Sequence, residues 1–465
     1  MGPPPVIAII GAGFCGALAS MLLLGGELPA GSRVVLLERP RRRIGGVAYD
    51  PPSERLLLNV PAERMSAFVD TPGDFVDFLR AAAPAHAPGD FVPRRLYGRY
   101  LEDRLERAAA RAAARVRFER RELDVLDVAH AAARWELRGV TGGHPVAMRA
   151  DAALLATGGG APVAPAWLEP AMRDSGLYSE AWAGERRALP ADGELLVIGT
   201  GLSFVDMLLE VRAGGFRGRV TAVSRHGRLP HVERGPAPPP EPSDAPPAFG
   251  ARANVREATR AVRRHARQLA QRDRDYRTLI AALRPQIADL WSRLPDAERA
   301  RFVRHGRSLW DVHRHRMPTV VAARVHAELA DGSLRVVAGR VTAVEHLAGA
   351  LHVTLRRRGT EEHERLHVQH VINCTGAAAG APLAAPWPVL VDRGHAQRDG
   401  MGLGVLTDAA GRLLGRHGAA ERLYYAGPLW RAQHWEMTAV PELRARLPAV
   451  AAAITADVVG HRDLA

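Results

Sequence analysis

The sequence predicts an α/β fold, because an apolar, strand-like run is twice followed by a glycine-rich turn and an apolar helical pattern. The first unit covers residues 6–24, and the second begins at Glu194. A further apolar strand follows each of them, at residues 33–38 and 219–224. This order of elements is typical of the βαβ unit of a Rossmann-like dinucleotide-binding fold. The units lie far apart in the chain, so they are not tandem repeats within one domain.

The first unit, VIAIIGAGFCG, carries the G-x-G-x-x-G pattern at Gly11, Gly13 and Gly16. In this pattern the first glycine permits a tight turn, the second lets the backbone approach a pyrophosphate, and the third lets the helix pack on the strand. The pyrophosphate then lies at the helix N-terminus, where unpaired N–H groups and the helix dipole favour negative charge. The next strand ends at Glu38, which is placed to accept hydrogen bonds from a ribose 2′-hydroxyl and would repel a 2′-phosphate. Other residues expected beside this cofactor are Phe14, Cys15 and Arg39.

The second unit carries Gly199, Gly201 and Ser203 in its turn, and its following strand ends at Arg225. A base at this position suits a 2′-phosphate, so we expect NADPH to be preferred over NADH. The third glycine position holds Phe204. A structural βαβ unit without a bound nucleotide is therefore the alternative.

Composition argues against several classes of protein. The 465 residues carry a net charge of +13, but all 63 basic residues are arginines scattered along the chain. Biased codon usage explains this better than nucleic-acid binding, because no basic run is interleaved with aromatic residues. No apolar run approaches the ~18 residues of a membrane span, so we expect no membrane partner.

Only two cysteines are present, Cys15 and Cys374. They form no C-x-x-C pair, which excludes a dithiol relay and a zinc ribbon, and we expect no metal site. Two lone thiols suit a reducing, cytoplasmic setting. The chain gives no prediction of its oligomeric state.

Several segments outside the two units also have an expected place. Residues 56–62, followed by residues 65–68, show little periodicity, which favours a loop that covers the cofactor and carries Asn59 and Met65. Residues 236–247 are rich in proline and are expected to be extended or mobile. Residues 251–330 are predicted to be helical, and they contain a polar and aromatic run at 309–316.

The order of these signals resembles flavoproteins in which an NAD(P) domain is inserted into an FAD domain. In such proteins a strand and a Thr-Gly turn stand at both crossing points, here matched by Thr157-Gly158 and Thr375-Gly376. The resemblance implies an FAD domain at residues 1–160 and 366–465 and an inserted NAD(P) domain with a helical region at 161–365. In such proteins a late strand also meets the flavin, here matched by residues 425–427. Pro428 stands where most of them have an aspartate whose carboxylate contacts the ribityl chain.

A narrower resemblance is carried by motifs spread over nearly the whole chain, at residues 46–49, 58–62, 65–68, 93–98, 199–203, 310–315 and 435–442. These are similar to a bacterial FAD/NAD(P)-binding family that includes an FAD-dependent urate hydroxylase and a nitrosuccinate-forming amino-acid N-oxygenase. The resemblance implies that NAD(P)H reduces FAD and that the reduced flavin forms a C4a-(hydro)peroxide with O₂. One oxygen atom then passes to a small polar or anionic metabolite. The alternatives are an oxidase or dehydrogenase without oxygen insertion, and a non-catalytic flavin-binding protein.

The same resemblance suggests roles for individual residues. Asn59 is a candidate for hydrogen bonding near the flavin or its peroxide, with a turn-forming asparagine as the alternative. Trp435 opens a C-terminal helix whose N–H groups could stabilise the anionic reduced flavin, or which simply closes the domain. Residues 313–316 could bind an anionic substrate or a nicotinamide phosphate, or form a solvated face. The remaining cofactor-binding candidates are Thr157, Gly158, Gly376, Gly427, Pro428, Thr438, Ala439 and Val440.

Overall fold

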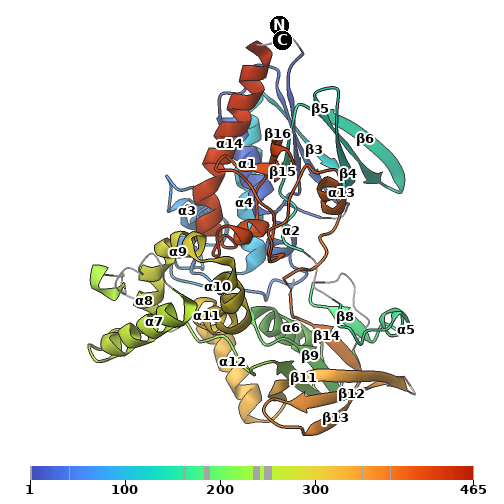
Figure 1. Cartoon of the computed structure of the whole chain (residues 1–465), viewed down its shortest axis with the longest axis vertical. Helices are drawn as coiled ribbons and strands as arrows, with labels where there is room; N and C mark the ends of the chain where they lie inside the picture. Colours follow the sequence, from blue (N-terminus) through green and yellow to red (C-terminus); the bar gives the residue numbers. More distant parts are fainter. Residues whose placement is uncertain are drawn as a thin grey trace.

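A computed structural model describes residues 3–40, 42–160, 164–182, 189–233, 241–245, 254–347, 349–376 and 379–463. Two sheets dominate it, one in the upper half of Figure 1 and one in the lower half. The first and last parts of the chain form the upper half, where the two termini lie close together. The middle of the chain forms the lower half.

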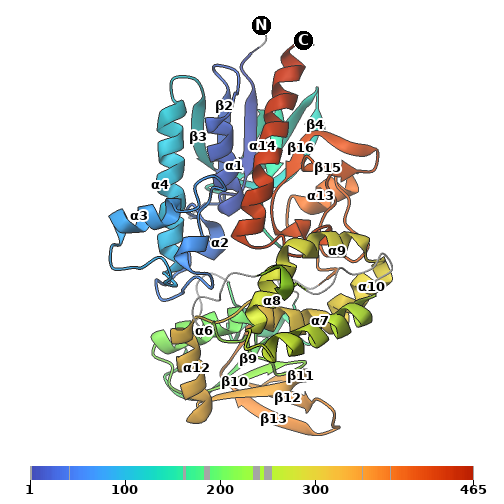
Figure 2. The same cartoon turned by 90° about the vertical axis from the view of Figure 1, so that its left-hand side faces the viewer.

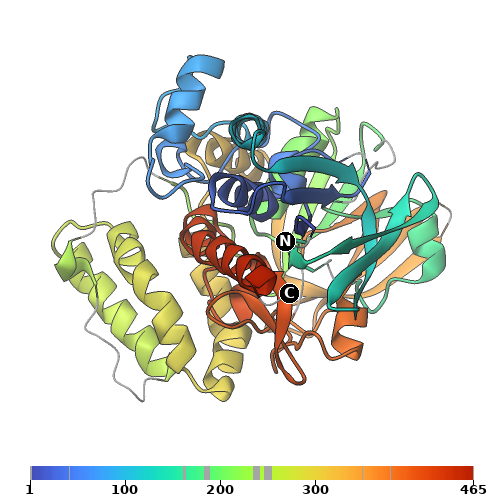
Figure 3. The ribbon, with the colours of Figure 1, turned by 90° about the horizontal axis from the view of Figure 1, so that it is seen from above.

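The first sheet has six strands, in the order β15 (Arg412–Gly415), β16 (Gly418–Tyr425), β7 (Ala152–Leu155), β1 (Val6–Ile10), β2 (Arg33–Glu38) and β3 (Arg117–Glu122). Parallel pairing joins β16, β7, β1, β2 and β3. Every residue of β1 is buried, as expected of an apolar strand that is covered on both faces. Figure 3 shows α1 and α14 on one face and a three-stranded sheet on the other. The two helices are α1 (Phe14–Gly25) and α14 (Val440–Asp463), and the three strands are β4 (Asp124–Ala131), β5 (Arg134–Thr141) and β6 (His144–Ala150). The helix α4 (Arg94–Ala112) packs against α1.

The second sheet has seven strands, in the order β13 (His363–Val368), β12 (Ala350–Arg357), β11 (Leu334–Leu347), β10 (Arg219–Ser224), β9 (Glu194–Ile198), β14 (His370–Asn373) and β8 (Tyr178–Glu180). Its centre is parallel, and β11, β12 and β13 extend it as an antiparallel meander. All seven strands lie between β7 and β15 in the chain. The second sheet is therefore inserted into the first, and the predicted fold class is confirmed.

The boundary between the second sheet and the returning first sheet lies later in the chain than the domain boundary expected at residue 366. Both β13 and β14 belong to the second sheet, although the expected boundary cuts through β13 and leaves β14 outside. The chain returns to the first sheet only after Asn373. The apolar pattern of β14 shows that it is a buried strand, but it does not show which sheet the strand joins.

A helical segment follows β10 and confirms the helices expected over residues 251–330. It comprises α7 (Val255–Ala270), α8 (Tyr276–Leu283), η3 (Arg284–Gln286), α9 (Ile287–Arg293), α10 (Asp296–Arg301), the π-helix η4 (Phe302–Gly306), α11 (Arg307–Arg314) and α12 (Thr319–Ala330). In Figure 2 most of it lies between the start of α14 and the second sheet. Of the proline-rich stretch 236–247, residues 236–240 and 246–247 lie outside the described residues, and the rest includes the short turn η2 (Pro242–Asp244).

The remaining elements are α2 (Gly46–Tyr49), η1 (Ala62–Arg64), α3 (Asp74–Ala82), α5 (Pro170–Asp174), α6 (Leu202–Ala213), α13 (Trp387–Asp392) and η5 (Pro428–Ala432). Among the residues described, no helix has both the length and the apolar character needed to cross a membrane.

Candidate functional site

The first glycine turn has the geometry that its sequence pattern predicts. Gly11 has φ +105°, and a Cβ atom placed there would lie 2.5 Å from the Ala156 carbonyl oxygen. A Cβ atom on Gly16 would lie 1.8 Å from the Gly11 carbonyl oxygen. A Cβ atom on Gly13 would meet nothing within 4 Å. The fold itself therefore needs Gly11 and Gly16, whereas Gly13 borders open space.

This open space lies at the N-terminus of α1. Gly13 caps the helix and offers no side-chain hydrogen bond, and the first turn of α1 contains no acidic residue. The unpaired N–H groups of such a helix end are available to an anion. The residues present therefore fit a pyrophosphate, which would fill the space that a side chain at Gly13 would occupy.

Phe14 and Cys15 contribute backbone rather than side chains to this site. Both side chains are buried in the first turn of α1. The Phe14 ring stacks on Tyr97 with the centroids 6.4 Å apart. Burial raises the pKa of the Cys15 thiol to about 12, so it stays protonated.

Glu38 is fixed beside the same turn. Its carboxylate accepts hydrogen bonds from the Ala12 N–H at 2.6 Å and from the Arg39 N–H at 2.8 Å. Arg39 points away into an exposed ion pair with Asp124 at 3.6 Å. Glu38 thus stands where an acid at the end of β2 would meet a ribose, whereas the side chain of Arg39 is paired elsewhere.

The residues after β2 pack directly on the glycine turn. The Gly45 N–H donates to the Ala12 carbonyl at 2.9 Å, and the Cβ of a residue at Gly46 would lie 3.2 Å from the Gly13 Cα. Gly45 and Gly46 both have positive φ. The segment that leads into the loop expected to cover the cofactor is therefore in contact with the turn.

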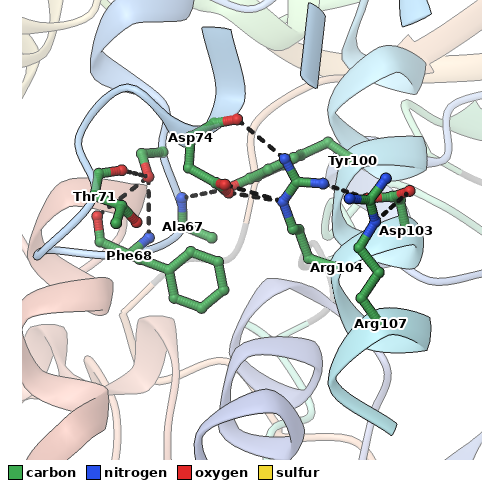
Figure 4. A network of polar contacts seen from close by, with 9 residues as sticks. Ala67, Phe68, Thr71, Asp74, Tyr100, Asp103, Arg104 and Arg107 are labelled. Carbon is green, nitrogen blue, oxygen red and sulfur yellow. Dashed lines mark hydrogen bonds and ion pairs between the residues drawn. The ribbon is translucent and has the colours of Figure 1, made fainter. Parts of the chain in front are cut away.

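The next part of this loop is held by the polar network in Figure 4. Asp74 accepts hydrogen bonds from the Tyr100 hydroxyl at 2.6 Å and the Arg104 Nε at 2.9 Å. The Tyr100 oxygen accepts one from the Ala67 N–H at 3.0 Å. Arg444 of α14 donates to the Ser66 carbonyl from the other side. Residues 65–68 are thereby fixed between α4 and α14, and Met65 is buried among them.

Asn59 lies earlier in this loop, where the loop contacts the second sheet's domain. Its neighbour Leu58 is fixed by a 2.9 Å hydrogen bond from its N–H to the Val92 carbonyl, and Leu57 packs against the core under the second sheet. The half-buried Asn59 amide makes no hydrogen bond within the part of the chain that the structure describes. Its role in binding a ligand therefore stays a prediction.

The second glycine turn repeats the geometry of the first. Gly199 has φ +106°, and a Cβ atom there would lie 2.7 Å from the Cys374 carbonyl oxygen. Gly201 borders open space at the start of α6, as Gly13 does at the start of α1, and Ser203 lies half-buried in the first turn. Phe204 is fully buried and packs in the core. The missing third glycine therefore does not change the turn.

The two Thr-Gly turns lie beside these glycine turns. Gly158 and Gly376 have φ +78° and +69°, and each follows a strand that pairs with β1 or β9. The Thr157 hydroxyl accepts a hydrogen bond from the Trp387 indole at 3.0 Å.

The late strand β16 reaches the same edge of the first sheet. Its end is fixed by the Ala426 N–H, which donates to the Leu155 carbonyl at 2.9 Å. Gly427 has φ +154°, and Pro428 begins η5. The structure thus brings together the first glycine turn, Thr157, Gly158, Gly427 and Pro428, while Gly376 lies beside the second turn.

The C-terminal candidates are placed differently from the expectation. Trp435 is only 3% exposed, and its ring packs against Trp291 at 4.9 Å, Phe302 at 5.0 Å and the Arg431 guanidinium at 4.7 Å. Its indole joins the helical segment to the C-terminal part of the chain and does not face open space. The helix α14 begins at Val440 rather than at Trp435, so Thr438 and Ala439 precede it as half-buried turn residues.

Residues 313–316 are largely paired within the protein. Arg314 donates to Glu436 at 2.9 Å, and Arg316 donates to Glu233 at 2.6 Å. Burial and the neighbouring arginines lower the pKa of His315 to about 3, so it is neutral. Sequence reasoning missed Glu436, which also accepts a hydrogen bond from the Trp310 indole at 2.7 Å.

An ion pair that sequence reasoning also missed joins the two halves. Arg94 of α4 contacts Asp206 of α6 at 2.8 Å, and both side chains are mostly buried. Burial raises the pKa of Asp206 to about 6, although Arg94 opposes the rise. Nothing in the local sequence of either residue signals the other.

Arg225 lines a cavity of about 850 Å³ at the end of β10. Seven arginines and two histidines surround this cavity. Among the described residues, no group of three or more His, Cys, Asp or Glu side chains is arranged to hold a metal ion.

Comparisons with known proteins agree with this geometry. Residues 8–160 match the model of an FAD-NAD(P)-binding family. No curated protein matches the chain by sequence.

Solved structures of similar fold cover nearly the whole chain. An ornithine hydroxylase from Pseudomonas aeruginosa is 15% identical with a TM-score of 0.64, over 98% of this chain and 99% of that one. An L-lysine 6-monooxygenase from Pseudomonas syringae is 17% identical with a TM-score of 0.64, over 98% and 100%. An ornithine N-hydroxylase from Kutzneria sp. 744, solved with reduced FAD, NADP⁺ and L-ornithine, is 16% identical with a TM-score of 0.59, over 99% and 100%. The chain therefore has the fold of these two-nucleotide flavoprotein monooxygenases, with its first glycine turn inside the part that matches an FAD-NAD(P)-binding family.

Proposed function

We propose that this protein is an FAD-dependent, NADPH-reduced monooxygenase that hydroxylates a small polar or anionic metabolite. The observation that carries the proposal is the pair of glycine turns with matching geometry, each open at its second glycine. The strand after the first turn ends in an acid, Glu38, and the strand after the second is followed directly by a base, Arg225. An acid suits a ribose 2′-hydroxyl and a base suits a 2′-phosphate, so two different dinucleotides fit the two turns.

FAD fits the first turn. Its pyrophosphate would lie against Gly13 and the start of α1, its adenosine ribose against Glu38, and its flavin end toward Thr157 and Gly427. When bound, FAD supplies hydride acceptance from NADPH and activation of O₂. We propose that residues 3–160 and the chain after Asn373 form this FAD domain, and that residues 164–373 form the inserted NADPH domain.

The chain's own residues orient the reactants and exclude water. Asn59, with its unpaired amide, would hold the substrate or the oxygen being transferred. Ala439 and Val440, at the start of α14, would offer backbone N–H groups to the flavin, whereas the Thr438 N–H already donates to the Glu436 carbonyl at 2.6 Å. Trp435 would act through packing, because it fixes this turn against the helical segment.

Amino-acid-like substrates are favoured over urate. The solved relatives that span the chain include hydroxylases of ornithine and lysine. A nitrosuccinate-forming N-oxygenase, one of the two activities suggested by the sequence motifs, belongs to the same reaction class. We therefore propose N-oxygenation of an amine on a small, carboxylate-bearing metabolite as the first activity to test.

The test begins with the purified protein and an anaerobic titration with NADPH and NADH, followed by ¹⁸O₂ labelling with a panel of amino acids and urate. We expect a yellow protein whose flavin NADPH reduces, and a product that carries ¹⁸O. Hydrogen peroxide without labelled product would instead favour an oxidase, and a flavin that neither nicotinamide nucleotide reduces would favour a non-catalytic flavin-binding protein. Arg225→Asp should raise the NADPH KM about tenfold or more and leave the NADH KM nearly unchanged.

A further inference from the structure

The cavity beside Arg225 is lined by more arginines than the recognition of a 2′-phosphate by Arg225 alone requires. It is lined by segments that are far apart in the sequence: residues 225–228 after β10, the middle of β11, the end of β12 with the turn that follows it, and residues 304–305 of η4. Among the lining residues that the structure describes, Glu361 is the one acid against seven arginines and two histidines. One of the contributing segments, η4, belongs to the helical segment rather than to the second sheet.

Some of these cations already have partners. Arg357 pairs with Glu364 at 3.0 Å, Arg358 lies 2.7 Å from the His226 ring, and Arg228 donates to Ser308 at 3.1 Å. Burial and the surrounding arginines lower the pKa of His226, which shows that the cavity disfavours further positive charge.

Three arginines in the lining have no such partner. Arg225, Arg304 and Arg340 make no hydrogen bond or ion pair within the described ranges of the chain. All three side chains are exposed, so solvent screens their mutual repulsion, but together they give the cavity a positive potential that attracts anions. Arginine is also the side chain whose geometry best suits phosphate.

We propose that this cavity is a phosphomonoester site built jointly by the second sheet and the helical segment, with Arg304 contributed by the latter. The proposal rests on the proposed function, because the expected ligand is the 2′-phosphate of NADPH. It goes beyond Arg225, since it makes Arg304 and Arg340 determinants of the preference for NADPH. Inorganic phosphate carries the same charged group, so the experiment below compares its binding with that of a nucleotide.

The position of η4 gives the site a structural consequence. This π-helix continues directly into α11 (Arg307–Arg314), which carries Trp310 and Arg314. Both of these side chains bind Glu436, next to the turn that precedes α14. A phosphate held by Arg304 therefore restrains the same helix that fixes the C-terminal turn.

Calorimetry on the full-length, FAD-loaded protein tests the site with 2′-AMP, 5′-AMP and inorganic phosphate as probes. We expect 2′-AMP to bind, and Arg304→Ala and Arg340→Ala each to weaken that binding about tenfold. The matched control is Arg301→Ala, an exposed arginine one helical turn before Arg304 that pairs with Glu298 and does not line the cavity. It should leave 2′-AMP binding unchanged.

Hydrogen exchange gives a second readout that is independent of activity. Binding of 2′-AMP should slow exchange in residues 307–314 of the wild type and not of Arg304→Ala. Equal 2′-AMP affinity in the wild type and in Arg304→Ala would overturn the shared site, as would 5′-AMP or inorganic phosphate binding as tightly as 2′-AMP. If NADPH reduces the flavin but 2′-AMP does not bind, this inference fails and the proposed function stands. If 2′-AMP binding depends on Arg304 but NADPH reduces no flavin, the proposed function fails and the phosphate site stands.

Discussion

Two neighbouring glycines should respond in opposite ways to substitution. At Gly13, φ is −68° and ψ is −173°, an extended conformation that any residue adopts, and an added Cβ atom meets nothing within 4 Å. Gly13→Val should therefore cost about 1 kcal/mol or less, the usual effect of a poorer helix cap. Its side chain would fill the space proposed for the pyrophosphate, so we expect FAD to bind at least ~100-fold more weakly, or ~2.7 kcal/mol.

Gly16→Ala should instead damage the fold. Its Cβ atom would lie 1.8 Å from the Gly11 carbonyl oxygen, whereas ordinary contacts begin near 3.4 Å. The start of α1 would have to move away from β1, which we expect to cost about 3 kcal/mol or more.

The assay is the flavin content of each purified variant together with its thermal unfolding midpoint. Gly13→Val should be colourless, and its midpoint should match that of wild-type protein stripped of FAD. Gly16→Ala should unfold at a clearly lower temperature even when compared with the stripped protein. A yellow Gly13→Val protein with full flavin content would refute the reasoning, and so would a Gly16→Ala protein as stable as the wild type.

Three further substitutions test the remaining parts of the account. The Asn59→Ala variant should still bind FAD and oxidise NADPH, but it should form about tenfold less hydroxylated product and release hydrogen peroxide instead. An unchanged yield of product would show that Asn59 serves only to form the turn. Arg94→Met should cost about 3–5 kcal/mol in urea unfolding at about pH 8, where the buried Asp206 carboxylate is left unpaired, and clearly less at about pH 5. The sign follows from the raised pKa of Asp206, about 6, because the native carboxyl is already neutral below it; a loss independent of pH would contradict this. Glu436→Ala should leave the buried Arg314 with only its longer 3.9 Å contact to Glu442 and lower the unfolding midpoint, whereas Glu436→Gln, which keeps an acceptor for the Trp310 indole, should lower it less; equal effects would show that the hydrogen bond to the indole adds nothing beyond the charge.

The parts of the fold that the sequence predicts best depend on local chemistry. The strand before Gly11 and the strand that ends at Glu38 are found at their predicted limits, and the helix between them, predicted from the apolar pattern at residues 17–24, begins three residues earlier at Phe14. Each is determined by apolar periodicity and by the glycine turn, in which Gly11 has a positive φ that other residues rarely adopt and Gly16 has no room for a side chain.

The parts that could not be predicted depend on contacts between distant segments. The apolar strand β14 joins the second sheet because it pairs with β9, and no local pattern selects that partner. The segment that begins at Trp435 has the sequence pattern of a helix start, but Trp435 packs against Trp291 and lies in a turn before α14. The phosphate cavity is equally invisible in the sequence, because Arg225 and Arg304 meet there from different segments of the chain.

The location of the flavin nucleotide is the claim on which the others depend, and a crystal structure of the FAD-loaded protein tests it most directly. We predict density for a diphosphate beside Gly13 at the start of α1, with an adenosine ribose on the Glu38 carboxylate. A flavin nucleotide bound elsewhere, with the space beside Gly13 closed by protein side chains, would contradict the account.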